Sequence, residues 1–200
     1  MKSLLKLLAV CMLLISLASC GATSKTQPAN EQTGETGNTV ESSNTISEDE
    51  DIQYAKSGTI ISFETTDVNG NTVKSEDLFG ENKFTLINLW QSWCPPCIAE
   101  MPDLNAINDE YKQFGVGVVG ILLDGNETEG LTDGLEIIEE TGAKYTVILP
   151  PENIMELLPA QAVPTSYFVD RKGMVLGLPI VGANPDEYRN RIEEYLSEGH

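Results

Sequence analysis

The chain has 200 residues and a formal net charge of −19 at pH 7, because 31 acidic residues outnumber 12 lysines and arginines. This length accommodates one domain of ordinary size with residues to spare. Nucleic acids and anionic lipid surfaces would repel such a chain, so the charge argues against both as binding partners.

The N-terminal segment, residues 1–19, has the pattern of an export signal. Lys2 and Lys6 provide its positive end, and the apolar run that follows is too short to span a bilayer. The run Leu17-Ala18-Ser19-Cys20-Gly21 resembles the bacterial lipobox, which implies cleavage before Cys20 and a lipid anchor on its sulfur. We therefore expect the mature protein to be membrane-anchored on the extracytoplasmic face. An ordinary secretory signal with a chance cysteine is the alternative.

Residues 20–57 are rich in Thr, Ser, Asn, Gln, Gly and Glu and have no aromatic residue before Tyr54. Such a segment cannot bury enough apolar surface to become ordered, so we predict a disordered, acidic tether. A single folded domain is predicted over residues 58–200.

Apolar runs, turn residues and helix caps divide this domain into short elements. The turn Asn69-Gly70-Asn71 predicts a hairpin between residues 59–63 and 72–73. Strands are predicted at 84–91, 116–123, 145–149, 165–169 and 174–181, and helical segments at 75–79, 95–114, 131–141, 153–158 and 185–196. This order predicts an α/β domain with a central mixed β-sheet flanked by helices and an N-terminal β-hairpin extension.

The sequence Trp93-Cys94-Pro95-Pro96-Cys97 directly follows the apolar run 84–90 and opens the next helix. Two sulfurs three residues apart on a first helical turn can close into a disulfide, and helix N–H groups favour a thiolate on the first of them. Cys11 would leave with the signal and Cys20 would carry lipid, so Cys94 and Cys97 would remain as the only thiols. An exported chain with one such pair is more often redox-active than structurally crosslinked.

These residues, together with Glu100-Met101-Pro102 and the later Val163-Pro164-Thr165, resemble the TlpA/ResA-like thiol–disulfide oxidoreductases of the thioredoxin superfamily. The resemblance covers residues from about 58 to 197. It implies a thioredoxin-like fold and exchange of a disulfide with partner proteins.

The resemblance assigns roles to the sulfurs and to one carboxylate. Cys94 would be the nucleophile and Cys97 the resolving thiol, which attacks the mixed disulfide between Cys94 and the substrate. Glu100, on the same side of the helix as Cys97, would handle its proton. Asn88 stands where cytosolic thioredoxins have a buried aspartate, and because Asn cannot titrate, this departure strengthens the role of Glu100. The alternative for Glu100 is a solvated helix residue.

The residues around the sulfur pair would contact substrate. Pro95 and Pro96 occupy helical positions that tolerate a missing N–H. Trp93 would flank the disulfide. Pro164 matches the superfamily's cis-proline, and the backbone of Val163 would pair with an extended substrate segment.

The family's partners are exported proteins that carry disulfides and a membrane electron donor of the CcdA/DsbD kind. By resemblance the chain would act as a reductant, for example in cytochrome c maturation, in spore-envelope formation or in recycling methionine sulfoxide reductases. No cofactor is expected.

Three other functions remain as alternatives. A metal carrier would need more ligands than one Cys pair, and the only histidine is His200. A thiol peroxidase of this fold has a Thr three residues before its reactive Cys, where this chain has Gln91 before Cys94. A redox-inactive binding lipoprotein would not need both sulfurs.

Overall fold

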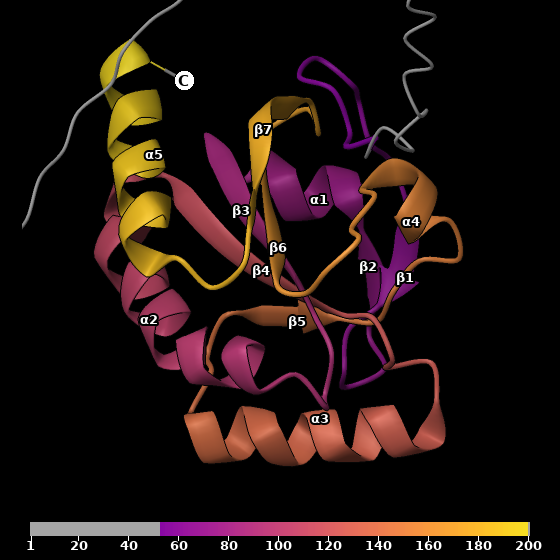
Figure 1. Cartoon of the computed structure of the whole chain (residues 1–200). Coiled ribbons are helices and arrows are strands. Elements are labelled where there is room, and N and C mark those ends of the chain that lie inside the picture. The colour runs from indigo at the N-terminus through magenta and orange to yellow at the C-terminus, as the bar shows by residue number, and fades with distance from the viewer. Residues whose placement is uncertain (1–52, 200) are drawn as a thin grey trace, which may run out of the picture. The chain divides into compact units, whose positions relative to one another are not determined.

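The computed structural model describes residues 53–199, and Figure 1 shows their arrangement. The signal segment, Cys20 and most of the proposed tether lie outside the described residues. Within residues 53–199, no helix is both long enough and apolar enough to cross a membrane.

The described residues form seven strands, five α-helices and one short 3₁₀-helix. Their bounds along the chain are β1 Glu64–Thr66, β2 Thr72–Lys74, α1 Ser75–Gly80, β3 Phe84–Trp90, α2 Pro95–Tyr111, η1 Lys112–Phe114, β4 Val116–Leu122, α3 Thr128–Thr141, β5 Thr146–Ile148, α4 Ile154–Leu157, β6 Thr165–Asp170, β7 Val175–Val181 and α5 Pro185–Glu198.

Five of the strands form one sheet in the order β5-β4-β3-β6-β7. The first three run parallel, while β6 pairs antiparallel with both β3 and β7. Every residue of β3 is buried, as expected for a central strand covered on both faces. The carboxyl ends of β3, β4 and β5 therefore share one edge of the sheet with the start of β6 and the end of β7. We call this the active-site edge, because Cys94 follows β3 there.

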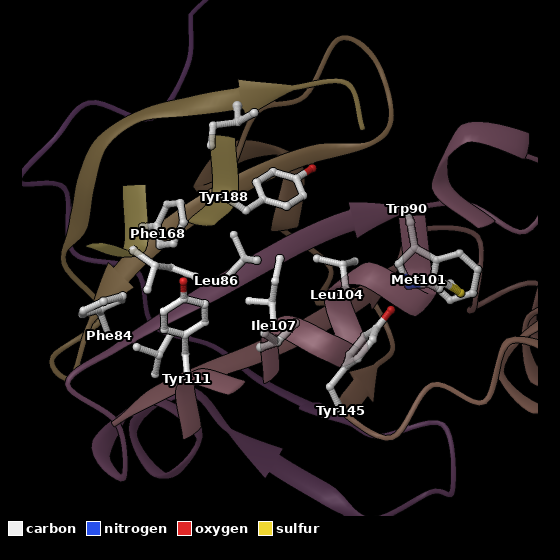
Figure 2. Packing of buried hydrophobic residues seen from close by; sticks show 14 of the residues in the cluster. Phe84, Leu86, Trp90, Met101, Leu104, Ile107, Tyr111, Tyr145, Phe168 and Tyr188 are labelled. Atoms are coloured by element: carbon white, nitrogen blue, oxygen red, sulfur yellow. The ribbon is translucent and has the colours of Figure 1, made fainter. Parts of the chain in front are cut away.

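Helices cover both faces of this sheet, and alternate residues of β3 point into each layer. Phe84, Leu86 and Trp90 pack with residues of α2 and α5, whereas Ile87 and Leu89 pack against the layer that contains α1 and α4. In Figure 2, Trp90 lies at the end of β3 beside Met101 of α2. The buried residues of α2 recur at helical spacing, at positions 97, 100, 101, 104, 107 and 111, so one side of the helix faces the sheet.

The predicted thioredoxin-like fold and its N-terminal hairpin are confirmed, but the first hairpin strand lies later than expected. It runs over Glu64–Thr66, and the Asp67 carboxylate closes the turn by accepting hydrogen bonds from the backbone N–H groups of Asn69 and Asn71. Residues 59–63 instead lie alongside the turn before β7 and the start of that strand, where the Ile61 N–H donates to the Gly173 carbonyl. The turn lies where the sequence predicts it, but its loop spans five residues, 67–71, so β2 pairs with Glu64–Thr66 and not with residues 59–63.

Two other boundaries differ from the sequence prediction. Ala55 is 8% exposed and packs in the core with Ile61, so the packed domain begins before residue 58. Helix α3 begins at Thr128, before its predicted start at residue 131. Its N-cap residue Glu127 has an extended backbone but makes no side-chain cap hydrogen bond, so the sequence contains no capping signal for this start.

Glycine is required at position 130, where α3 meets the loop after β4. A Cβ atom there would overlap the carbonyl oxygen of Asp124, which belongs to the backbone and cannot move aside as the end of a flexible side chain could. We expect Gly130→Ala to lower the free energy of unfolding by about 1–3 kcal/mol, measured by urea denaturation. Gly80→Ala is the matched control, since nothing lies within 4 Å of its added Cβ. Equal stability of the two variants would contradict this expectation.

Candidate active site

Cys94 is the N-cap residue of α2, at the point where β3 ends and the helix begins. Its backbone is extended, and its sulfur accepts a hydrogen bond from the Cys97 N–H at 3.3 Å. Pro95 and Pro96 fill the next two positions and are exposed. Because proline has no N–H, the first turn of α2 presents the Cys97 N–H as its donor to this sulfur.

Cys94 and Cys97 are joined by a disulfide, and both are almost fully covered. Cys94 is 3% exposed and Cys97 is fully buried within the core cluster of α2. Trp93 is 68% exposed beside them, while Trp90 is completely buried and belongs to the core. A reacting thiol can therefore reach only Cys94, and only over a small part of its surface.

The loop before β6 lies against the disulfide. The Val163–Pro164 peptide bond is cis, as the resemblance implied. The Val163 carbonyl oxygen lies 3.6 Å from the Cys94 Sγ. The structure thus brings together Cys94, Trp93 and the Val163–Pro164 loop, which were singled out from widely separated parts of the sequence.

Glu100 lies beneath the disulfide, one turn into α2 beyond Cys97, and is only 2% exposed. Its Oε1 accepts a hydrogen bond from Asn88 Nδ2 at 2.8 Å, and its Oε2 accepts one from the Tyr188 hydroxyl at 2.9 Å. The same Asn88 nitrogen donates to Ser166 Oγ at 3.0 Å. Glu100 is therefore a buried, hydrogen-bonded carboxyl, and the interpretation as a solvated helix residue is wrong.

Burial raises the pKa of Glu100 to about 7, although the hydrogen bonds from Asn88 and Tyr188 act in the opposite direction. Burial also raises the pKa of the Tyr145 and Tyr188 hydroxyls, and the Glu100 carboxylate contributes to both shifts. Figure 2 shows these two tyrosines on the α2 side of the sheet. Glu100 can consequently gain and lose a proton near neutral pH in an apolar setting.

A second carboxylate holds the loop that carries Cys94. The Asp124 side chain accepts hydrogen bonds from the Ser92 hydroxyl at 2.6 Å and from the Ser92 N–H at 3.1 and 3.2 Å. The Cys94 N–H in turn donates to the Gln91 carbonyl. These bonds attach the loop between β3 and α2 to the loop that follows β4.

Sequence reasoning missed Tyr188, Ser92 and Asp124 as parts of this site. Tyr188 is 88 positions from Glu100, so no local pattern connects the two residues. A signal for Asp124 was present, since it follows a parallel strand neighbouring β3, where side chains converge at the same edge. Among residues 53–199, no group of three or more His, Cys, Asp or Glu side chains is placed to hold a metal ion.

The AhpC/TSA family matches residues 58–177. The thiol–disulfide oxidoreductase ResA of Bacillus thuringiensis (strain Al Hakam) is 30% identical over 137 residues, which are 68% of this chain and 73% of that protein. ResA of Bacillus anthracis matches equally well over the same shares of both chains.

Solved structures show the same similarity. The crystal structure of a putative thiol:disulfide interchange protein DsbE from Chlorobium tepidum is 28% identical, with a TM-score of 0.61. The match covers 72% of this chain and 98% of that one.

The buried carboxyl should make stability depend on pH. In the folded protein Glu100 keeps its proton up to about pH 7, whereas in the unfolded chain the ordinary pKa is 4.5. Unfolding between these pH values therefore releases a proton, so the free energy of unfolding should fall as pH rises from 4.5 to 7 and then level off. For this shift of the Glu100 pKa, the fall is about 3 kcal/mol.

We expect Glu100→Gln to remove this decline, measured by urea unfolding across the pH range. Glu139→Gln, an exposed site on α3, is the control and should keep the wild-type slope. Parallel pH profiles for wild type and Glu100→Gln would contradict the expectation.

Proposed function

This chain belongs to the AhpC/TSA family and, within it, to the ResA-type thiol–disulfide oxidoreductases, and from that premise we propose that it is a lipid-anchored reductant of exported proteins. The observation that carries the proposal is the Cys94–Cys97 disulfide at the start of α2, with only Cys94 reachable and the cis-Pro164 loop beside it.

The reaction we propose transfers two electrons to a substrate disulfide. In the reduced protein the Cys94 thiolate attacks one substrate sulfur, which forms a mixed disulfide and releases the other substrate sulfur as a thiolate. Cys97 then loses its proton and attacks the Cys94 sulfur. This step forms the Cys94–Cys97 disulfide and releases the second substrate sulfur, so the substrate leaves as a dithiol.

Glu100 is the acceptor we propose for the Cys97 proton. It follows Cys97 by one helical turn on the buried side of α2, and its pKa of about 7 matches a base that works near neutral pH. Asn88 and Tyr188 orient the carboxyl through one hydrogen bond to each oxygen. This role agrees with the absence of a titratable group at position 88.

The geometry around the Cys94 sulfur favours a reductant over an oxidant. Strong oxidants of this superfamily owe their potential to a reduced form with a highly stabilised thiolate. Here Pro95 and Pro96 withhold two N–H groups, and the Cys97 N–H is the helix donor to the sulfur. Weak stabilisation of the thiolate makes the dithiol the better electron donor.

Membrane anchoring and the partners are supported by sequence alone. The lipobox-like run ending in Cys20 would attach the chain to the extracytoplasmic face of the membrane, and the polar segment after it would act as a tether. There the oxidised protein would recover electrons from a CcdA/DsbD-like membrane thiol donor. Its substrates would be exported proteins with disulfides, as in cytochrome c maturation, spore-envelope formation or methionine sulfoxide reductase recycling.

The direct test of the proposed function is thiol exchange with the neutral disulfide of 2-hydroxyethanethiol. We expect the reduced protein to react and the Cys94→Ser variant to be inactive, because Cys97 is buried. Cys97→Ser should instead stop at a mixed disulfide detectable by mass spectrometry, and in cell extracts it should trap the natural partner. The reduction potential should lie nearer the thioredoxin value of about −270 mV than the DsbA value of about −120 mV. A reduced protein that fails to exchange would refute the function, and an oxidising potential would refute its direction.

The role of Glu100 predicts a change in the rate–pH profile. In the wild type, resolution of the mixed disulfide should accelerate as pH rises through about 7, because Glu100 loses its proton there. Glu100→Gln should slow this step by about tenfold or more at pH 7, as expected for loss of a general base, and should lack the inflection. Stopped-flow measurement with Glu139→Gln as control decides this. An unchanged profile would limit Glu100 to a structural role.

A further inference from the structure

An apolar groove of about 350 Å³ opens beside the disulfide. Its lining includes Trp93, Met155 of α4, Leu123 and Val163. Trp93 is 68% exposed and Met155 is 46% exposed, so both side chains present large apolar surfaces to water. Exposed apolar surface next to a reactive group is typical of a binding site.

The groove is also a path to the sulfur. Cys94 is 3% exposed, and two of its immediate neighbours, Trp93 and the Val163 carbonyl, border the groove. A partner segment in the groove would bring its own sulfur to Cys94 alongside the Val163 backbone.

The loops at the active-site edge that border the groove carry only negative charge, while the exposed Lys56 lies in the N-terminal segment that packs beside α4 through Ala55. The loops at this edge span residues 91–94, 123–127, 149–164 and 182–184 and contain no lysine or arginine. Their exposed carboxylates are Glu127, which follows the groove residue Leu123, and Glu152 and Glu156, which flank the groove residues of α4. We call these three residues the acidic rim.

Five of the nine basic residues within 53–199 lie instead at the opposite edge of the sheet, and the other four are Lys56, Lys74, Arg189 and Arg191. That edge holds the start of β3, the helix η1 that precedes β4, the turn from β6 to β7 and the segment before β5. The basic residues of these segments are Lys83, Lys112, Lys144, Arg171 and Lys172. The side chains of the acidic rim take part in none of the ion pairs within residues 53–199. The rim is therefore free to attract a cationic partner.

We propose that the groove and the acidic rim together bind an extended cationic segment of the partner protein, with an apolar side chain next to its reactive cysteine seated between Trp93 and Met155. This inference rests on the proposed function and specifies its substrate class. A second copy of this chain is a poor occupant, since two acidic rims would repel each other.

Two synthetic peptides test the charge requirement. Both have one cysteine next to a leucine, blocked as a mixed disulfide with thionitrobenzoate, and one has lysines and the other glutamates on either side. Attack by Cys94 releases thionitrobenzoate, whose absorbance gives the rate constant. At low ionic strength we expect the lysine peptide to react about tenfold faster or more, with the preference falling as salt is added.

The net charge of the whole chain could produce a preference of its own, so matched variants are needed. The rim variant, Glu127→Gln with Glu152→Gln and Glu156→Gln, should lose most of the preference. The control variant, Glu81→Gln with Glu139→Gln and Glu140→Gln, changes the net charge equally at exposed sites away from the groove and should keep it. Equal preference in the two variants would overturn the proposal.

The groove itself is tested by the neighbour of the cysteine. Wild type should prefer the lysine peptide with leucine at this position over the same peptide with serine, and Met155→Ser should reduce that preference. No leucine preference in the wild type, or a dimer in sedimentation that Met155→Ser abolishes, would overturn the proposal. Exchange of wild type and the control variant with the neutral disulfide monitors the proposed function independently, so its failure is distinguishable from failure of this inference.

Discussion

The Glu100 carboxyl joins three elements at the point where the domain performs its chemistry. It belongs to α2, and its two oxygens accept hydrogen bonds from Asn88 on β3 and Tyr188 on α5. Because a buried carboxyl without partners is costly, these bonds hold the helix at a defined distance and rotation above the sheet. Cys94 and Cys97 open the same helix, so their position relative to the sheet depends on this contact.

The parts of the fold that the sequence predicted are those with strong local signals. The buried run of β3, the Cys-x-x-Cys at a helix start and the start of the last helix at Pro185 all lie where expected. The first hairpin strand differs from the prediction because residues 59–63 also have the composition of a strand, yet they bond to the residues around the start of β7 and leave Glu64–Thr66 to form the hairpin.

The site shows the same division between local and distant information. The sulfur pair and the cis-Pro164 loop could be recognised from short motifs, and helical spacing placed Glu100 near Cys97. Its burial could not be deduced, because Tyr188 and Ser166, which complete the network, come from distant strands and helices. The attachment of Ser92 to Asp124 similarly depends on strand order, which no local pattern reveals.

Both sulfurs belong to the hydrophobic core cluster that includes Trp90 and Met101. Breaking the bond between them places two thiols in a space packed around a disulfide, so the oxidised and reduced forms must differ in how firmly they resist denaturation. By a thermodynamic cycle, that difference equals the difference between the free energy of reducing the disulfide in the folded protein and that of reducing it in the denatured chain. Any core substitution near Met101 that favours one form would thereby retune the protein as a redox couple, without touching a reacting atom.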